Sequence, residues 1–101
     1  MMASYILRQE GSVINSAEPL EYEIPLEGRV LRKTGKNGRT DIMTLKPHKQ
    51  EHVCAVIAEV TQGFFHIRNL GRRYSMMSGE WNFLYEGDLI FCSGLGYRLY
   101  Q

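Results

Sequence analysis

Apolar and polar residues alternate along much of this chain with the two-residue period of a β-strand. Glu21 to Leu26 alternates charged with apolar side chains, and Phe64 to Arg68 also alternates, as in strands that have one face in water. Val53 to Val60 is apolar almost throughout and predicts a central strand. No segment from Glu51 to Leu99 has the length and 3.6-residue period of a stable helix. The pattern therefore predicts an all-β protein.

The predicted strands are short and nearly regularly spaced, with Gly, Pro or Asn in the segments between them. In chain order they cover 4–8, 21–26, 30–31, 41–45, 53–60, 64–68, 74–77, 82–85, 89–92 and 97–100. Pro25 places its strand at a sheet edge or marks its end, and Pro47 is expected to stop the strand before it. Gln62-Gly63 predicts a tight turn that joins two strands in a hairpin. Such spacing favours a two-sheet antiparallel β-sandwich, with a small barrel as the alternative.

The length of 101 residues fits one domain, which we predict over residues 1–101 with its core at about 4–100. The apolar fraction of 44% is that of a globular protein. No apolar stretch approaches the roughly 18 residues of a membrane-spanning helix, and no secretory signal is visible at the N-terminus. Cys54 and Cys92 lie in apolar runs and are expected to be reduced packing residues. A cytoplasmic domain without disulfides or membrane contact is expected.

The net charge of +1 conceals an uneven distribution. Residues 1–28 carry five glutamates against Arg8, whereas residues 29–49 carry seven arginines and lysines against Asp41. Such a concentration of cations around a loop predicts an anion site. The alternative is a solvated loop that keeps the domain in solution.

Motifs for metal binding or catalysis are weak. His48, Glu51 and His52 spell H-x-x-E-H, a zinc pattern that works on a helix because both imidazoles then share one face. Pro47 and the strand-like run after His52 indicate an extended chain instead, so His52 is expected to be a structural histidine bonded to a loop backbone. Gly87-Asp88 predicts a turn in which the carboxylate accepts backbone amides. We therefore expect no enzyme, no metal and no cofactor.

Nine aromatic residues between Phe64 and Tyr100 could form a stacking platform for single-stranded nucleic acid. Core packing is the favoured explanation, because a platform needs cations on the same face and these concentrate upstream of Phe64. A small β-barrel that binds nucleic acid remains an alternative, and nucleic acid is not the expected partner.

The order of the motifs resembles that of forkhead-associated (FHA) domains over about Tyr5 to Leu99. The clearest match is Leu84-Tyr85-Glu86-Gly87-Asp88-Leu89-Ile90, which is similar to the family strand Leu-x-x-Gly-Asp-x-Ile. Shorter matches align Val30-Leu31-Arg32 with the strand ending in Gly-Arg, Thr40-Asp41-Ile42 with Asn-Asp-Ile, Lys49 to His52 with Ser-Arg-x-His, and Phe65 to Gly71 with the strand ending in Asp-Leu-Gly. The resemblance implies an FHA/SMAD-like sandwich and a non-catalytic protein–protein interaction module that binds phosphothreonine or an acidic peptide.

FHA domains hold the phosphate with the Arg of Gly-Arg, the Ser of Ser-Arg-x-His and an Asn in a later turn. Arg32 can supply the first of these, but Lys49 stands at the Ser position and Arg72-Arg73 replaces the Asn-Gly turn. Cations bind phosphate well, so the predicted binding set is Arg32, Lys33, Lys49, Arg72 and Arg73. The missing Ser and Asn leave a second possibility open. It is a phosphate-independent scaffold of a larger assembly, such as a secretion system, that self-associates or binds an unmodified protein.

Overall fold

The computed structural model describes residues 4–10, 17–92 and 94–101, with the side chain of Cys92 outside that description. Within these ranges all regular structure is β. The strands are β1 (Tyr5–Gln9), β2 (Glu21–Ile24), β3 (Arg29–Thr34), β4 (Thr40–Gln50), β5 (Val53–Gln62), β6 (Phe64–Asn69), β7 (Arg72–Met77), β8 (Trp81–Leu84), β9 (Leu89–Cys92) and β10 (Leu95–Tyr100). The predicted all-β class is confirmed.

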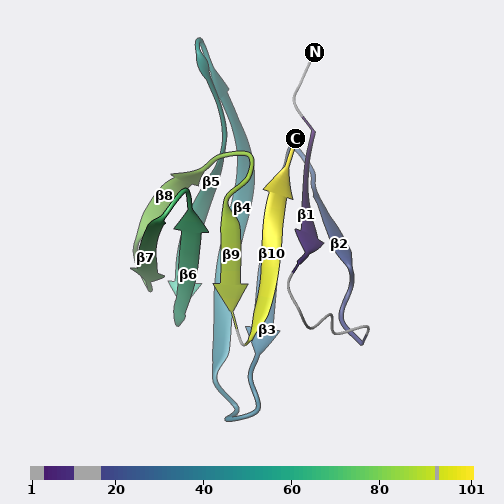
Figure 1. The fold of residues 1–101 in the computed structure, drawn as a ribbon, viewed down its shortest axis with the longest axis vertical. Coiled ribbons are helices and arrows are strands. Elements are labelled where there is room, and N and C mark those ends of the chain that lie inside the picture. The colour runs from purple at the N-terminus through teal and green to yellow at the C-terminus, as the bar shows by residue number, and fades with distance from the viewer. Residues whose placement is uncertain (1–3, 11–16, 93) are drawn as a thin grey trace.

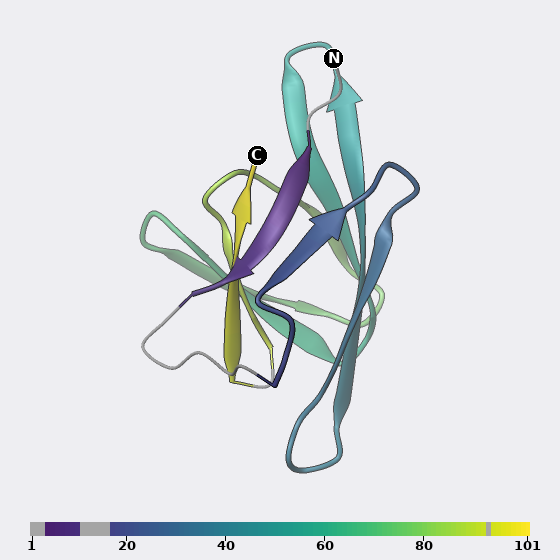
Figure 2. The same cartoon turned by 90° about the vertical axis from the view of Figure 1, so that its right-hand side faces the viewer.

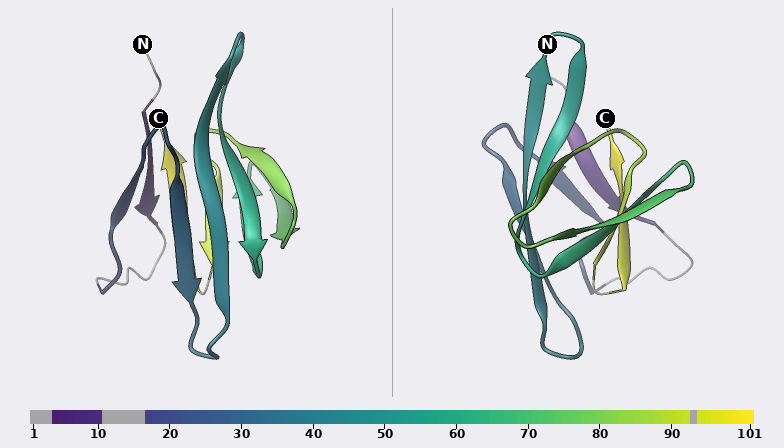
Figure 3. Two further views of the ribbon diagram at one scale, coloured as in Figure 1. Left: turned by 180° about the vertical axis from the view of Figure 1, so that it is seen from behind. Right: turned by 90° about the vertical axis from the view of Figure 1, so that its left-hand side faces the viewer.

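The strands form two antiparallel sheets that pack face to face (Figures 1 and 2). One sheet has six strands in the order β2-β1-β10-β9-β6-β7, and the other has four in the order β3-β4-β5-β8, seen from behind in Figure 3. Because each sheet keeps two edge strands, the molecule is a β-sandwich and the barrel alternative is wrong as a fold. Alternate side chains point inward from both sheets. The largest buried side chains are Tyr5, Tyr97, Phe65, Leu7, Leu31, Met43, Leu45, Ile67, Leu84, Ile90, Leu99 and Val56.

The longest hairpin joins β4 to β5 and extends beyond the rest of the sandwich at the top of Figure 1. Pro47 does not stop β4, contrary to the prediction, and pairs with Val56 inside the strand. The reason lies in the neighbouring strand β3, whose pairing with β4 ends at Leu45. Beyond Leu45 one side of β4 is open, and a proline there removes no ladder hydrogen bond.

The connection between β5 and β6 is not a hairpin, so this prediction is wrong. Gly63 instead carries the chain from the four-stranded sheet to the six-stranded one, where β6 pairs with β7 and β9. The buried carboxylate of Asp41 accepts the Phe64 amide at 3.1 Å beside this crossing. A Cβ at Gly63 would lie 2.0 Å from the Asp41 Oδ1, and the φ of Gly63 is +73°. The crossing therefore requires glycine.

The β6–β7 connection is the true hairpin of this region. Asn69 pairs with Arg72 across a two-residue loop, in which Leu70 and Gly71 have φ of +48° and +81°. Two positive φ values are those of a type I′ turn, whose twist matches that of the flanking strands. This turn sets the register of β6 against β7.

Candidate functional site

The cations predicted to bind phosphate do not meet at one site. Arg32 pairs with Ile42, and Lys49 lies seven residues further along β4, which is about 23 Å at roughly 3.3 Å per strand residue. Figure 2 shows the β3–β4 loop and the β4–β5 turn at opposite ends of the molecule. Arg72 and Arg73 lie on β7 in the other sheet. The structure therefore does not bring the predicted residues together, because loop composition indicates exposure but not distance.

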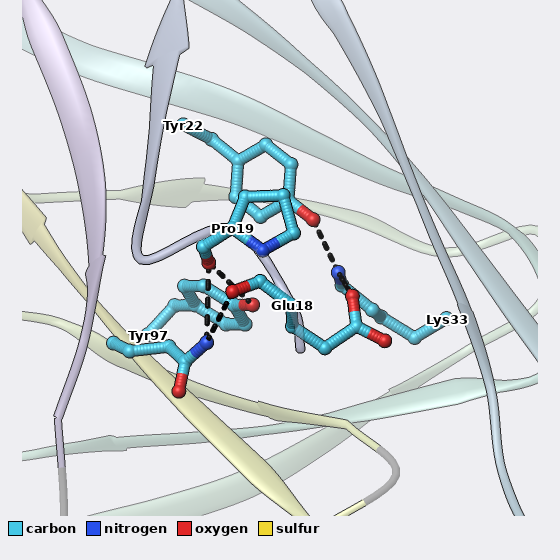
Figure 4. A network of polar contacts seen from close by, with 6 residues as sticks. Glu18, Pro19, Tyr22, Lys33 and Tyr97 are labelled. Carbon is cyan, nitrogen blue, oxygen red and sulfur yellow. Dashed lines mark hydrogen bonds and ion pairs between the residues drawn. The ribbon is translucent and has the colours of Figure 1, made fainter. Parts of the chain in front are cut away.

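Lys33 is buried, with only 4% of its surface exposed, and its ammonium is bonded within the protein. Its ammonium donates to the Glu18 carboxylate at 2.9 Å and to the Tyr22 hydroxyl (Figure 4). It also lies 4.6 Å from the centre of the Tyr22 ring and 5.4 Å from that of Tyr97. Burial alone would lower the pKa of Lys33, but the hydrogen bonds that Lys33 donates to Tyr22 and Glu18 outweigh it and raise the pKa above its ordinary value.

The same network fixes the segment before β2. Tyr97 donates its hydroxyl to the carbonyl of Pro19 at 3.3 Å (Figure 4). Gln9 donates its side-chain amide to the same carbonyl at 3.1 Å. Segment 17–20 is thereby held against β1, β3 and β10 by polar contacts that include a buried charge.

The other residues singled out from the sequence occupy turns or exposed positions. Asp88 is buried in the turn after β8, where its Oδ2 accepts the Tyr85 amide at 2.8 Å and Gly87 has a φ of +90°. His52 is not a backbone-bonded structural residue: it lies in the β4–β5 turn, 88% exposed, with Glu51 at 3.4 Å. Cys54 is exposed rather than packed in the core. The expectation for Cys92 falls on a side chain outside the described part of the structure.

The outer face of the six-stranded sheet carries a row of arginines, of which sequence reasoning singled out Arg73 alone. In the strand register Arg8 lies opposite Arg98, Leu89 lies between Arg98 and Arg68, and Arg68 lies opposite Arg73. The row thus runs across β1, β10, β9, β6 and β7. Arg8, Arg98 and the Arg68–Arg73 pair are far apart in sequence, so only the strand order brings the three together.

Aromatic rings interleave with this row. The Arg68 guanidinium lies 4.9 Å from the centre of the Phe91 ring, and that of Arg8 lies 5.0 Å from the Tyr100 ring. Both are distances of a cation–π contact. The expectation that aromatic residues and cations occupy separate regions is therefore wrong for this face.

Carboxylates neutralise one end of the row. Arg8 pairs with Glu21 at 2.7 Å, and Arg98 pairs with Glu10 at 2.8 Å. Hydrogen bonds from Tyr100 and Arg98 lower the pKa of Glu10, which keeps it charged and holds Arg98 in place.

The other end of the row carries uncompensated charge. Among the described residues, no carboxylate lies within 4 Å of the guanidinium groups of Arg68 or Arg73. The positive potential of this face is consequently concentrated on β6 and β7.

A cavity of about 240 Å³, here named the β6–β7 pocket, opens at this charged end. It is lined by His66, Ile67, Arg68, Arg73, Tyr74, Ser75 and Phe91. The Nδ1 of His66 and the Oγ of Ser75 are 2.7 Å apart and hydrogen-bonded. Tyr74, which also lines the pocket, packs against the core. The lining thus offers two guanidinium groups, an imidazole, the Ser75 hydroxyl and the Phe91 ring, and it contains no carboxylate. Such a donor set suits an anionic group with several acceptor oxygens.

Comparisons with known proteins leave the site to be judged on its own geometry. No protein-family model, curated protein or solved structure matches this chain. In the described part of the chain no cluster of three or more His, Cys, Asp or Glu side chains could hold a metal ion. A search of the described residues for a helix long and apolar enough to cross a membrane finds none.

Proposed function

We propose that this protein is a non-catalytic interaction module that holds a phosphorylated side chain of a protein partner in the β6–β7 pocket. The observation that carries the proposal is the cross-strand pair Arg68 and Arg73, which lines the pocket without a carboxylate partner among the described residues. Guanidinium forks bind phosphate through two parallel hydrogen bonds and are stronger partners for it than neutral donors.

The size of the pocket favours one phosphate-bearing side chain over a cofactor. Its volume of about 240 Å³ is below the range of about 300–1,000 Å³ typical of small-molecule sites. Phe91 provides an apolar wall beside the cations, against which the carbon atoms of such a side chain can pack.

The distribution of charge favours a peptide over nucleic acid. A nucleic-acid strand needs a continuous basic path, and Glu10 and Glu21 interrupt the arginine row beyond β9. A local cationic pocket suits a single phosphate better. The resemblance to FHA domains stays a prediction, and the site proposed here lies on a sheet face instead of in the loops that the resemblance implies.

The proposal is tested by amide NMR titration with a degenerate pool of phosphothreonine and phosphoserine peptides, and with the unphosphorylated pool as a control. We expect phosphate-dependent shifts at β6 and β7. Arg68→Gln and Arg73→Gln should each weaken binding by roughly 10- to 100-fold, since a hydrogen bond to a charged group contributes about 1.5–3 kcal/mol. Arg32→Gln and Lys49→Gln are matched controls from outside the pocket and should leave binding unchanged.

Three outcomes contradict the proposal. Equal binding of both pools favours the phosphate-independent scaffold. Loss of phosphopeptide binding in Arg32→Gln, with the pocket variants unaffected, returns the site to the loops. Tighter binding of a thymidine oligonucleotide, falling steeply with salt and with Tyr100→Ala, favours a nucleic-acid surface.

A further inference from the structure

We infer that the phosphorylated peptide binds as an added antiparallel or parallel strand along the free edge of β7; this inference rests on the proposed function. β7 is an edge strand of the six-stranded sheet: among the residues that the structure describes, β6 pairs with it on one side and no strand on the other. An edge strand presents unpaired amide and carbonyl groups, and an extended peptide can pair with them.

The hairpin register identifies the backbone groups that are free. In a two-residue hairpin the residues that flank the loop exchange hydrogen bonds, and such pairs alternate with pairs whose backbone groups point away. Asn69 and Arg72 flank the loop here. The amides and carbonyls of Arg73, Ser75 and Met77 therefore point to the open edge.

An independent contact supports this assignment and limits the length of the edge. The amide of Met77 donates to the Glu80 carboxylate, and the carbonyl of Met77 accepts the Glu80 amide at 2.9 Å. Met77 thus points outward as the alternation requires, and its two groups are already bonded. Arg73 and Ser75 remain as the residues that can pair with a partner strand.

These two residues also line the β6–β7 pocket with their side chains. In a sheet, residues directly opposite each other on neighbouring strands have Cβ atoms about 4.5–5.5 Å apart on the same face. A phosphorylated residue opposite Arg73 or Ser75 would therefore project onto the face where the pocket opens. One short segment of β7 would then supply both the backbone hydrogen bonds and the cations.

Charge indicates the kind of partner. Arg72 and Arg73 project from β7 to opposite faces of the sheet, and Arg68 lies beside Arg73 on β6. A peptide with acidic residues beside its phosphate complements this charge. The acidic edge strand β2 of a second copy is the competing occupant. Its Glu21 is already paired with Arg8, which favours a peptide from another protein.

The test uses the same phosphopeptide pool with Ser75→Pro, which removes the outward amide without breaking a β6–β7 ladder bond. Ser75→Ala is the matched control, because it removes the hydroxyl and keeps the amide. Both variants lose the Ser75 hydroxyl that lines the pocket, so the loss of the outward amide is measured by the difference between them. We expect Ser75→Pro to weaken pool binding at least tenfold more than Ser75→Ala does. Shifts at Arg68 and Arg73 on addition of inorganic phosphate should persist in both variants. If Ser75→Pro binds the peptide pool as tightly as Ser75→Ala does, strand addition at β7 is refuted, while the proposed phosphate site in the β6–β7 pocket is not.

Hydrogen exchange in the wild-type protein gives a second measurement that does not depend on the fold of a variant. The amides of Arg73 and Ser75 should become protected when the phosphopeptide pool is added, and not when inorganic phosphate is added. Exchange unchanged by the pool would refute strand addition. Absence of any phosphate-dependent binding would instead refute the proposed function. If the free protein self-associates and Glu23→Gln abolishes this association, the edge of β7 binds strand β2 of a second copy instead of a peptide.

Discussion

Replacement of Lys33 by methionine tests whether a buried charge holds the N-terminal segment to the sandwich. The side chain loses a charge-assisted hydrogen bond to Glu18 and one to Tyr22, together with contacts to two tyrosine rings. Each bond contributes about 1.5–3 kcal/mol, and the ring contacts add about 0.5–1 kcal/mol. Two effects offset much of this loss. The variant no longer has to bury an ammonium, and the partly exposed Glu18 carboxylate can be solvated by water when Lys33 is gone. We expect a net loss of about 2 kcal/mol in the free energy of unfolding.

Urea and thermal denaturation followed by circular dichroism measure the effect. A loss of about 2 kcal/mol lowers the Tm of a domain of this size by about 10 °C. Arg32→Met is the control, because Arg32 is the exposed neighbour on the same strand and its loss should change stability by less than about 0.5 kcal/mol. The network raises the pKa of Lys33 in the folded protein. The contribution of Lys33 to the free energy of unfolding is therefore fully present below the pKa of about 10.4 that lysine has in the unfolded chain, and it is lost only at higher pH. The difference between the two proteins should therefore stay constant from pH 6 to 9. Equal or greater stability of Lys33→Met would mean that burial of the ammonium costs as much as its contacts return.

Two further substitutions test the crossing between the sheets and the acid response. Gly63→Ala should cost at least about 2 kcal/mol by urea denaturation, because its Cβ would meet the Asp41 carboxylate at a positive φ. Gly38→Ala, with a similar φ and open space, should cost only about 1 kcal/mol, and equal costs would refute the role of the contact. The folded pKa of Glu10 is lowered, so its contribution is present above the unfolded pKa of about 4.3 and is lost as the pH falls through the folded pKa. The stability difference between the wild type and Glu10→Gln should accordingly shrink between pH 5 and 2, and a constant difference would contradict the assignment.

Much of the fold could be predicted from the sequence because each strand has its own signal. Alternation and turn residues place a strand at or near each observed position, from Tyr5 to Tyr100. The assignment of strands to sheets is harder. A tight glycine turn serves both a hairpin and a crossing between sheets, and only the buried carboxylate of Asp41 beside Gly63 distinguishes the two.

The candidate site was less predictable for a physical reason. Arg68 and Arg73 lie five residues apart on either side of a turn, so a hairpin alone could have paired them. Phe91, which walls the pocket, comes from β9 and joins them only through the sheet order. Lys33 resembles its exposed neighbours in sequence, and its burial depends on Glu18 and Tyr22 from another segment. The sequence shows where charged residues occur along the chain, but the fold decides which of them have a partner within the protein.

The prolines divide the edges of the molecule into those that resist pairing and those that permit it. Pro25 follows directly on β2, and Pro47 lies where β4 extends beyond β3 with its other side open. A strand from another molecule finds no amide donor at Pro47, which protects the long hairpin from edge-to-edge aggregation. β7 contains no proline, and its open stretch is only a few residues long before Glu80 closes it. The edge thus admits a short segment and excludes the long, continuous pairing from which fibrils grow.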